Sequence, residues 1–474
     1  MELRFLGANG QVTGARHLLK MDGFQVLIDC GMVQERELLD RNWEPLPEPE
    51  SASKIDAVIV THAHLDHCGW LPRLMTQGFR GPIYATGASA ELIGLILRDS
   101  AHIQEEDVAF KLKRHKKEGR KSPHPVVPLY TQKDVETTLP MLRRVEYHQT
   151  VALRDGPNAI EATFYEAGHL LGSAFVVVTE HRDDGAKRIL FSGDLGKKDR
   201  PILRDIEYFT NPSETLDAVV IESTYGDRVQ DTTVSVDDQL VEVINRTIRR
   251  GGKVIAPVFA VERAQEVLYR LSLLRRENRI PAVPIFLDSP MAVEATRIFA
   301  SHSECFDAET NRLLADGYQF RLPEMQFLKT AQESMRLNTL SGPAIILSSA
   351  GMCNAGRIKH HLANHIGNKK NTILFLGYQA LGTLGRTILE RPKSVRIHGR
   401  VLPLRAEIAS IHGISGHADR NELIEWMDAI PSPPPKIFVV HGDEDAASSL
   451  AEVFRTKYAQ TTVKVPRYGD LEPV

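Results

Sequence analysis

Three histidines and one aspartate stand close together near the start of the chain. His62, His64, Asp66 and His67 lie in the run Thr61-His62-Ala63-His64-Leu65-Asp66-His67. Imidazole nitrogens and carboxylate oxygens are ligands that zinc favours in proteins. The apolar, β-branched residues just before the run favour a strand, so the four side chains are expected on a strand-end loop. The spacing predicts a metal site in which alternate side chains point toward two neighbouring ions.

A closed structural zinc site fits this run less well. Such sites are usually rich in cysteine, whereas Cys68 stands alone beside the run and the chain has no Cys-x-x-Cys pair. The 4 cysteines are also too few and too scattered for a disulfide framework, which fits a reducing compartment.

Three more polar residues lie where strand-like runs meet glycine-rich turns. They are His169, Asp194 and His441. Functional side chains concentrate on loops of this kind. Together with the first run they can form a dinuclear site. One ion would be held by His62, His64 and His169, and the other by Asp66, His67 and His441. Asp194 would bridge the two ions through its two oxygens.

Composition limits the class of protein. The chain has 474 residues, which favours two or three domains, and its 42% hydrophobic and 25% charged residues are ordinary for a globular protein. The formal charge of −3 excludes a globally basic nucleic-acid binder. No apolar stretch approaches membrane-spanning length and no signal peptide is recognisable, so we expect a cytoplasmic protein with no membrane partner.

The pattern of apolar runs changes along the chain. Short strand-like runs separated by glycines dominate the first part, with a helix expected over 88–117. From about residue 211, strands alternate with longer helices, which predicts a separate α/β domain with one parallel sheet. Its expected strands are 218–221, 254–258, 284–287, 344–347 and 372–376. A helix is expected over 261–274.

The order of these histidine and aspartate motifs resembles the metallo-β-lactamase superfamily. That resemblance implies an αββα sandwich with zinc at the edge of its two sheets. The inserted α/β segment further resembles the β-CASP branch of nucleic-acid-processing enzymes. The implied fold class is α/β, with a discontinuous metallo-β-lactamase domain formed by 1–210 and 396–474 and an inserted β-CASP domain over 211–395. The chain looks similar to bacterial homologues of the nuclease that cleaves pre-mRNA 3′ ends.

The β-CASP branch adds three motifs that match residues of this chain. They correspond to Glu222, His417 and His441. In the family, histidine at the third position accompanies action on RNA. The resemblance therefore implies a zinc-dependent ribonuclease acting on single-stranded RNA in a cleft between the two domains. Endonucleolytic cleavage is expected, with 5′-to-3′ exonuclease activity as a further option.

The chemistry also follows from the residue types. Two divalent ions ~3.5–4 Å apart can activate a water and stabilise both oxygens of an in-line phosphoryl displacement. Asp66 is a candidate acceptor of the water's proton, and His417 is the candidate acid that protonates the leaving oxygen. A nearby carboxylate such as Glu222 favours the protonated, charged form of the His417 imidazole. Asp29 is expected to hold the ligand loop without touching metal. Two Zn²⁺ ions are expected, with Mn²⁺ as a substitute.

Substrate contacts are less defined. Ser348, Ser349 and Gly351 follow a predicted strand and precede a helix, where amides and hydroxyls can bind a phosphate. Arg263 either contacts a phosphate or pairs with a carboxylate. The basic run 111–121 either guides RNA or is a solvated helix face. His360, His361 and His365 are interpreted as surface or domain-interface residues.

Two other functions stay open at this point. One is a metallo-phosphodiesterase for DNA or cyclic nucleotides, and the other is an RNA-binding scaffold subunit without catalysis. The intact ligand set argues against the scaffold. The oligomeric state is also open, with a homodimer as one option.

Overall fold

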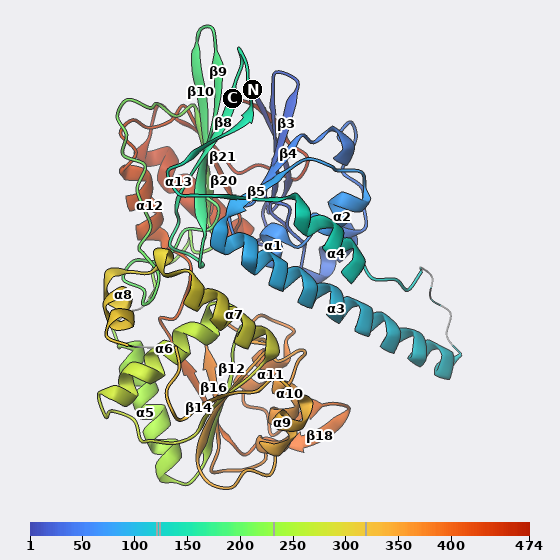
Figure 1. Cartoon of the computed structure of the whole chain (residues 1–474), viewed down its shortest axis with the longest axis vertical. Coiled ribbons are helices and arrows are strands. Elements are labelled where there is room, and N and C mark those ends of the chain that lie inside the picture. Colours follow the sequence, from blue (N-terminus) through green and yellow to red (C-terminus); the bar gives the residue numbers. More distant parts are fainter. Residues whose placement is uncertain (120–121, 123–124, 231–232, 318–319) are drawn as a thin grey trace. The chain divides into compact units, whose positions relative to one another are not determined.

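The chain folds into two units, each with its own apolar core. The computed structural model describes residues 1–119, 122, 125–230, 233–317 and 320–474. Unit 1 comprises 1–229 and 416–474, and unit 2 comprises 230–415. Both boundaries of unit 2 thus lie about 20 residues later in the sequence than those expected for the insertion, 211 and 395. Figure 1 shows the elements of both units.

Unit 1 contains two seven-stranded sheets. The strand order of the first sheet is β22-β1-β2-β3-β4-β5-β6, and β3 to β6 run parallel. Its strands are β1 (Glu2–Gly7), β2 (Arg16–Met21), β3 (Phe24–Ile28), β4 (Ala57–Ile59), β5 (Ile83–Thr86), β6 (Leu142–Val145) and β22 (Leu471–Pro473).

The second sheet of unit 1 has the order β21-β20-β11-β10-β9-β8-β7. Strands β7, β8, β9 and β10 pair in that order and are antiparallel, whereas β10, β11, β20 and β21 pair in that order and are parallel. Its strands are β7 (Thr150–Arg154), β8 (Ile160–Glu166), β9 (Ala174–Arg182), β10 (Gly185–Phe191), β11 (Ala218–Glu222), β20 (Lys436–Val440) and β21 (Thr462–Lys464).

One apolar core joins these two sheets face to face. Leu3, Val26 and Ile59 of the first sheet pack with Phe164, Val176 and Phe438 of the second, and all are buried. Alternation along the strands turns the other side chains outward, where helices cover them. Unit 1 has α1 (Leu65–Cys68), α2 (Leu71–Thr76), α3 (Gly87–Glu118), α4 (Gln132–Thr138), α12 (Arg420–Asp428) and α13 (Glu444–Lys457), with the short helices η1 (Arg36–Asn42), η2 (Ala52–Lys54) and η3 (Leu139–Met141). The expected αββα sandwich is confirmed.

Unit 2 is built on a six-stranded parallel sheet of order β14-β13-β15-β12-β16-β19. Its strands are nearly continuous apolar runs because both faces are covered. They are β12 (Lys253–Pro257), β13 (Ile285–Asp288), β14 (Met325–Phe327), β15 (Ala344–Ser348), β16 (Thr372–Leu376) and β19 (Glu407–Ile411). A separate hairpin consists of β17 (Ser394–Ile397) and β18 (Arg400–Pro403).

Helices cover both faces of this sheet. Leu240, Leu268 and Val293 pack on one face, while Ile358 and Ile388 pack on the other. The helices are α5 (Val236–Arg249), α6 (Arg263–Arg276), α7 (Pro290–Ser301), α8 (Ala308–Ala315), α9 (Ala331–Arg336), α10 (Ile358–His365) and α11 (Leu384–Leu389), with η4 (Ser303–Cys305). Among the described residues, no helix is both long and apolar enough to cross a membrane.

One strand expected in the inserted sheet lies elsewhere. Residues 218–221 form β11 of unit 1, which pairs with β10 and β20. An apolar parallel strand looks the same in either unit, so its sequence does not reveal its partners. The position of β11 matters for the site because it brings Glu222 beside β10 and β20.

Candidate metal centre

The candidate ligands of unit 1 lie where parallel strands of its two sheets end. Asp29 follows β3, and Thr61 and His62 come just after β4. In the second sheet, Glu222 is the last residue of β11 and His441 directly follows β20. Because the carboxyl ends of parallel strands share one edge, residues far apart in the chain meet there.

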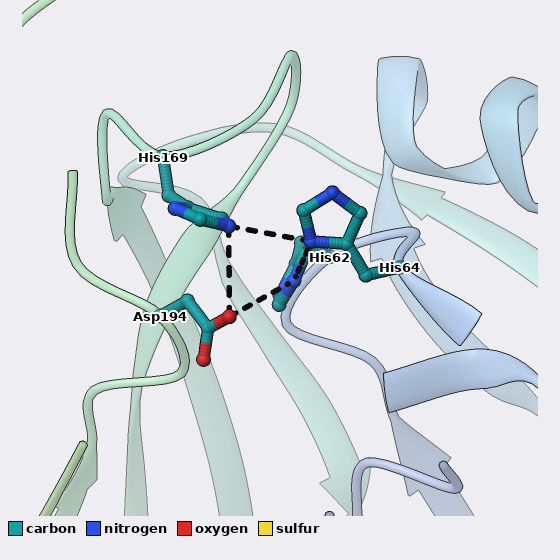
Figure 2. A group of neighbouring side chains, drawn as sticks. All are labelled: His62, His64, His169 and Asp194. Atoms are coloured by element: carbon teal, nitrogen blue, oxygen red, sulfur yellow. Dashed lines mark hydrogen bonds and ion pairs between the residues drawn. The ribbon is translucent and has the colours of Figure 1, made fainter. Parts of the chain in front are cut away.

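His62, His64, His169 and Asp194 form the first group, drawn in Figure 2. His64 Nδ1 lies 3.0 Å from His62 Nε2 and 3.3 Å from His169 Nε2. Asp194 Oδ2 lies 3.5 Å from both His62 Nε2 and His169 Nε2. Three ring nitrogens and one carboxylate oxygen therefore face one point.

Asp66, His67 and His441 form a second group beside the first. His67 Nε2 lies 3.0 Å from His441 Nε2, which lies 3.6 Å from Asp66 Oδ2. His67 Nε2 is also 3.3 Å from Asp194 Oδ1. The two oxygens of Asp194 thus face different groups, which is the arrangement of a bridging carboxylate.

The donor atoms of both groups fit divalent metal ions. In a tetrahedral zinc site with bonds of ~2.0–2.1 Å, neighbouring ligand atoms lie ~3.3–3.4 Å apart. The separations of 3.0, 3.3 and 3.5 Å in the first group are close to that value. Asp194 Oδ1 is buried and accepts no hydrogen bond from the described residues. A cation would satisfy this oxygen and the facing nitrogens together.

Contacts outside the two groups fix the orientation of the imidazole rings. Asp29 Oδ2 lies 2.7 Å from His67 Nδ1, and Asp29 Oδ1 accepts a 2.8 Å hydrogen bond from the Thr61 backbone amide. His169 Nδ1 lies 3.1 Å from the Gly416 carbonyl oxygen. These partners leave the opposite ring nitrogen free to face the centre.

Asp66 and His67 lie in the one-turn helix α1 rather than on the loop expected for them, and close packing of the backbone holds this turn in place. A Cβ atom on Gly31 would lie 1.6 Å from the Asp66 carbonyl oxygen, so no larger residue fits there. The amides of Ala15 and Met32 donate to the carbonyls of Asp66 and Leu65 at 2.8 and 2.9 Å. The segment that follows β3 therefore preorganises the ligand-bearing segment 62–67.

Burial makes the imidazoles of the first group poor proton acceptors. It lowers the pKa of His62 and His169 well below the usual range and that of His64 to about 4. Neutral imidazoles are the form that binds metal. For Asp194, burial alone would raise the pKa, but the nearby His441 and His67 charges hold it well below its usual range.

His417 and Glu222 form a pair beside the first group. His417 Nδ1 lies 3.2 Å from both carboxylate oxygens of Glu222, and 3.9 Å from Asp194 Oδ2. Burial lowers the pKa of His417, but the Glu222 charge and hydrogen bond outweigh it and raise the pKa to about 9. The side chain of His417 is 20% exposed, unlike that of Glu222 at 0%. An imidazolium is thus held at the edge of the cluster.

Unit 2 holds the expected substrate-contact residues, and they are not equally available. The Ser348 hydroxyl is buried and donates to the Asp288 carbonyl oxygen at 2.9 Å. Arg263 is buried and donates to Glu266 Oε2 at 2.7 Å. The Ser349 hydroxyl has no hydrogen-bond partner among the described residues. Gly351 lies under the Phe259 ring, which a Cβ would approach to 3.0 Å.

One residue of the site region was missed from the sequence, and two histidines of unit 2 were interpreted wrongly. His17 of β2 is buried and lines a small cavity behind Asp29, His67 and His441. Burial lowers its pKa to about 3. In unit 2, His361 and His365 are buried rather than at the surface, and His361 Nε2 lies 2.6 Å from Asp288 Oδ2. The only available signal was a histidine on an apolar strand or helix face.

Known protein families match most of the chain. A metallo-beta-lactamase superfamily domain matches residues 18–224 and a Beta-Casp domain matches residues 264–388. A Zn-dependent metallo-hydrolase RNA specificity domain matches residues 401–466.

Relatives also match along the full chain. Ribonuclease TTHA0252 of Thermus thermophilus is 36% identical over 472 residues, covering 99% of each chain. Transcription termination factor FttA of Methanocaldococcus jannaschii is 32% identical and covers 98% of this chain and 70% of its own length. A protein of unknown function from Enterococcus faecalis V583 has a similar crystal structure, with a TM-score of 0.56 at 11% identity over 99% of both chains. That last likeness concerns the fold alone.

Proposed function

The chain belongs to the β-CASP branch of the metallo-β-lactamase superfamily and is a metal-dependent hydrolase. From that premise we propose that it is a zinc-dependent ribonuclease that hydrolyses phosphodiester bonds of single-stranded RNA. Endonucleolytic cleavage is the proposed mode. A 5′-to-3′ exonuclease activity is distinguishable by the products described below.

The bridging position of Asp194 is the observation that carries the proposal. Its two oxygens face two separate sets of ligands, as a dinuclear centre requires. The first ion would be held by His62, His64, His169 and Asp194, and the second by Asp66, His67, His441 and Asp194. Such a pair of ions acidifies water and stabilises the charge that develops in an in-line displacement at phosphorus.

The other residues would handle protons and orientation. Asp66 is the solvent-exposed member of the second group, and its side chain is 17% exposed. Burial raises its pKa, but hydrogen bonding to His441 and nearby histidine charges lower it to about 2, so Asp66 is a weak base and better suited to orienting the water. The His417 imidazolium would donate a proton to the leaving oxygen, and Glu222 would keep His417 protonated.

RNA as the substrate is supported by the relatives and by the third motif. The RNA specificity domain matched over 401–466 includes both His417 and His441. The relative with 36% identity is named a ribonuclease. Ser349 and Gly351 are proposed as phosphate contacts in unit 2, because the Ser349 hydroxyl is not used by a protein partner.

A time course on 5′-labelled single-stranded RNA and on matched DNA tests the proposal. Wild type with zinc or manganese is compared with Asp194→Ala and His417→Ala, and circular dichroism verifies that the variants fold. Internal RNA fragments that both variants fail to produce, with DNA intact, are expected. Mononucleotides released from the labelled end would indicate an exonuclease.

Two outcomes would overturn the ribonuclease proposal. Equal cleavage of DNA or of a cyclic nucleotide would identify a broader phosphodiesterase. RNA binding without metal-dependent cleavage would identify a scaffold subunit.

A further inference from the structure

Helix α3 begins beside the loop that carries His169 and extends away from it. The Thr86 and Ser89 hydroxyls at its start donate to the Gly172 carbonyl oxygen at 2.5 and 2.8 Å, and Gly172 belongs to the His169 loop. The helix runs for 32 residues, from Gly87 to Glu118. At 1.5 Å per residue, Lys111 lies ~36 Å along the axis from the first helical residue.

The two halves of α3 have different surroundings. The first half is anchored in the core of unit 1 by side chains such as Leu92, Ile93 and Leu97, which are each 0% exposed. In the last nine helical residues, only His115 is even partly buried. These last nine residues therefore form an arm that the core of unit 1 does not need for packing (Figure 1).

One face of this arm combines an exposed aromatic ring with three cations. Phe110, Lys113, Arg114 and Lys117 occupy positions i, i+3, i+4 and i+7, which share one face of an α-helix. Phe110 is 67% exposed, although phenylalanine is normally buried. We call these four residues the arm face. They span ~10 Å along the helix axis.

Among the described residues, no acidic side chain pairs with the arm-face cations. Residues 111–117 include five lysines and arginines and no acid. Within the described parts of the chain, the structure gives no ion pair for any of the three arm-face cations. Attraction to the helix dipole acts only on the last turn, so it explains Lys117 but not Lys113. Arg120 and Lys121 of the basic run lie outside the described residues.

We propose that the arm face binds the phosphodiester backbone of single-stranded RNA at a distance from the metal centre, with Phe110 stacking on a base. The proposal rests on the proposed ribonuclease function and extends it to a second contact on the substrate. Cations that follow the backbone beside an exposed aromatic ring are the usual means of binding single strands without sequence preference. A chain of net charge −3 needs such a local patch to hold a polyanion.

A remote contact makes a specific prediction about substrate length. RNA too short to reach from the metal centre to the arm gains nothing from it, whereas longer RNA does. Removing the arm cations should therefore impair cleavage of long RNA alone. Each phosphate contact on a single strand contributes ~0.7 to the slope of log affinity against log salt, so losing three should reduce that slope by ~2.

The test neutralises the arm face with the triple variant Lys113→Gln, Arg114→Gln and Lys117→Gln. A matched control changes three exposed lysines elsewhere, Lys54→Gln, Lys133→Gln and Lys393→Gln. The value of kcat/KM is measured for RNA of ~6 and of ~30 nucleotides, and fluorescence anisotropy gives the affinity for the longer RNA at several salt concentrations. We expect a loss of about tenfold on the longer RNA for the arm variant alone, with the shorter RNA unaffected.

A second pair of variants separates stacking from charge. Phe110→Ala should weaken binding of the long RNA by roughly fivefold or more, while Leu112→Ala should not. Leu112 is a suitable control because it is 50% exposed on the same arm but lies on another face. Both substitutions remove exposed apolar side-chain area, and both introduce alanine, which has a high helix propensity.

The outcomes distinguish this inference from the function on which it rests. If wild type cleaves neither RNA, the ribonuclease proposal fails, and the anisotropy measurement still tests the arm. If wild type cleaves RNA and the arm variant matches the control on both lengths and in salt dependence, the arm inference fails alone. An equal loss on the short and the long RNA would also overturn it.

Discussion

Each unit buries a carboxylate at the carboxyl end of a parallel strand, but the two carboxylates have different partners. Asp288 ends β13 of unit 2 and is 0% exposed, with Arg357 Nη1 at 2.7 Å and His361 Nε2 at 2.6 Å. Asp194 follows β10 of unit 1 and is 2% exposed, and every ion pair that the structure describes for it is with a histidine. The protein supplies the permanent cation for Asp288. Among the described residues, Asp194 faces only titratable imidazoles, so it has no permanently charged partner.

This difference separates a structural carboxylate from one that we propose to be functional. Hydrogen bonds from His361, Ser334 and Arg357 lower the pKa of Asp288 although burial would raise it. The network links β13 to α9 and α10, and so holds unit 2 together. Around Asp194, buried imidazoles face the carboxylate and one another, which suits metal binding and little else.

The largest expected effect is at Asp194. Asp194→Ala should reduce RNA cleavage by at least ~10⁴-fold, since it removes the group that both ions share. Asp288→Ala should leave the turnover of the folded enzyme within about threefold of wild type. Steady-state cleavage at a temperature where both variants are folded measures this contrast. Equal losses in the two variants would remove the distinction between the two carboxylates.

Stability should show the reverse contrast. Asp288→Ala leaves Arg357 and His361 without their buried partner and should destabilise the protein by about 3–5 kcal/mol. Asp194→Ala removes a buried carboxylate whose partners are titratable imidazoles, which can lose their protons when the carboxylate is gone, so it should cost less in metal-free protein. Denaturant unfolding in the presence of a chelator measures both. A larger loss for Asp194→Ala than for Asp288→Ala would contradict the account.

Glu222 tests the proton donor separately from the metals. Glu222→Gln removes the charge that raises the pKa of His417, so the imidazolium population near neutral pH should fall and cleavage should drop by about 10²-fold. Metal content should be unchanged, because Glu222 contacts His417 and the Leu195 amide. A variant that loses metal together with activity would make Glu222 part of the ligand set instead.

A third buried carboxylate gives the smallest expected effect. Glu166 ends β8, and burial raises its pKa to about 8, although hydrogen bonds from the Gly168 amide and Tyr147 and the charge of Arg204 lower it in part. Because the folded pKa lies above the unfolded value, ionisation favours the unfolded state. Stability should therefore fall by about 2 kcal/mol between pH 6 and pH 8 on account of this group.

Glu166→Gln should remove that part of the pH dependence. Unfolding free energies of the two proteins at pH 6 and pH 8 measure it. Parallel pH profiles would show that Glu166 is ionised at no cost in the folded protein.

The composition of the candidate site was largely predictable from sequence, because its residues sit at recognisable strand ends. The seven expected ligands fall into the two groups expected for them, and Glu222 lies beside His417. Their metal binding stays a prediction. The αββα sandwich, the parallel sheet of unit 2 and the long helix expected over 88–117, observed as α3, are confirmed.

Sequence gave less information about partners inside the apolar layers. The strand 218–221 was assigned to the wrong sheet because apolar parallel strands of both units have the same pattern. Asp288 was not singled out, since its side-chain partners come from α9 and from the first part of α10, with no fixed spacing from Asp288. His361 and His365 were misinterpreted as surface or domain-interface residues, because an eight-residue helix is too short to reveal its buried face.

The most direct test of the central claim is the number of metal ions bound per chain. Protein is purified, loaded with zinc, freed of loose metal by dialysis and analysed by inductively coupled plasma mass spectrometry. The account predicts two zinc ions per chain in wild type and in Glu222→Gln, and fewer than one in Asp194→Ala. Wild type that retains no zinc, or an Asp194→Ala variant that retains as much as wild type, would contradict it.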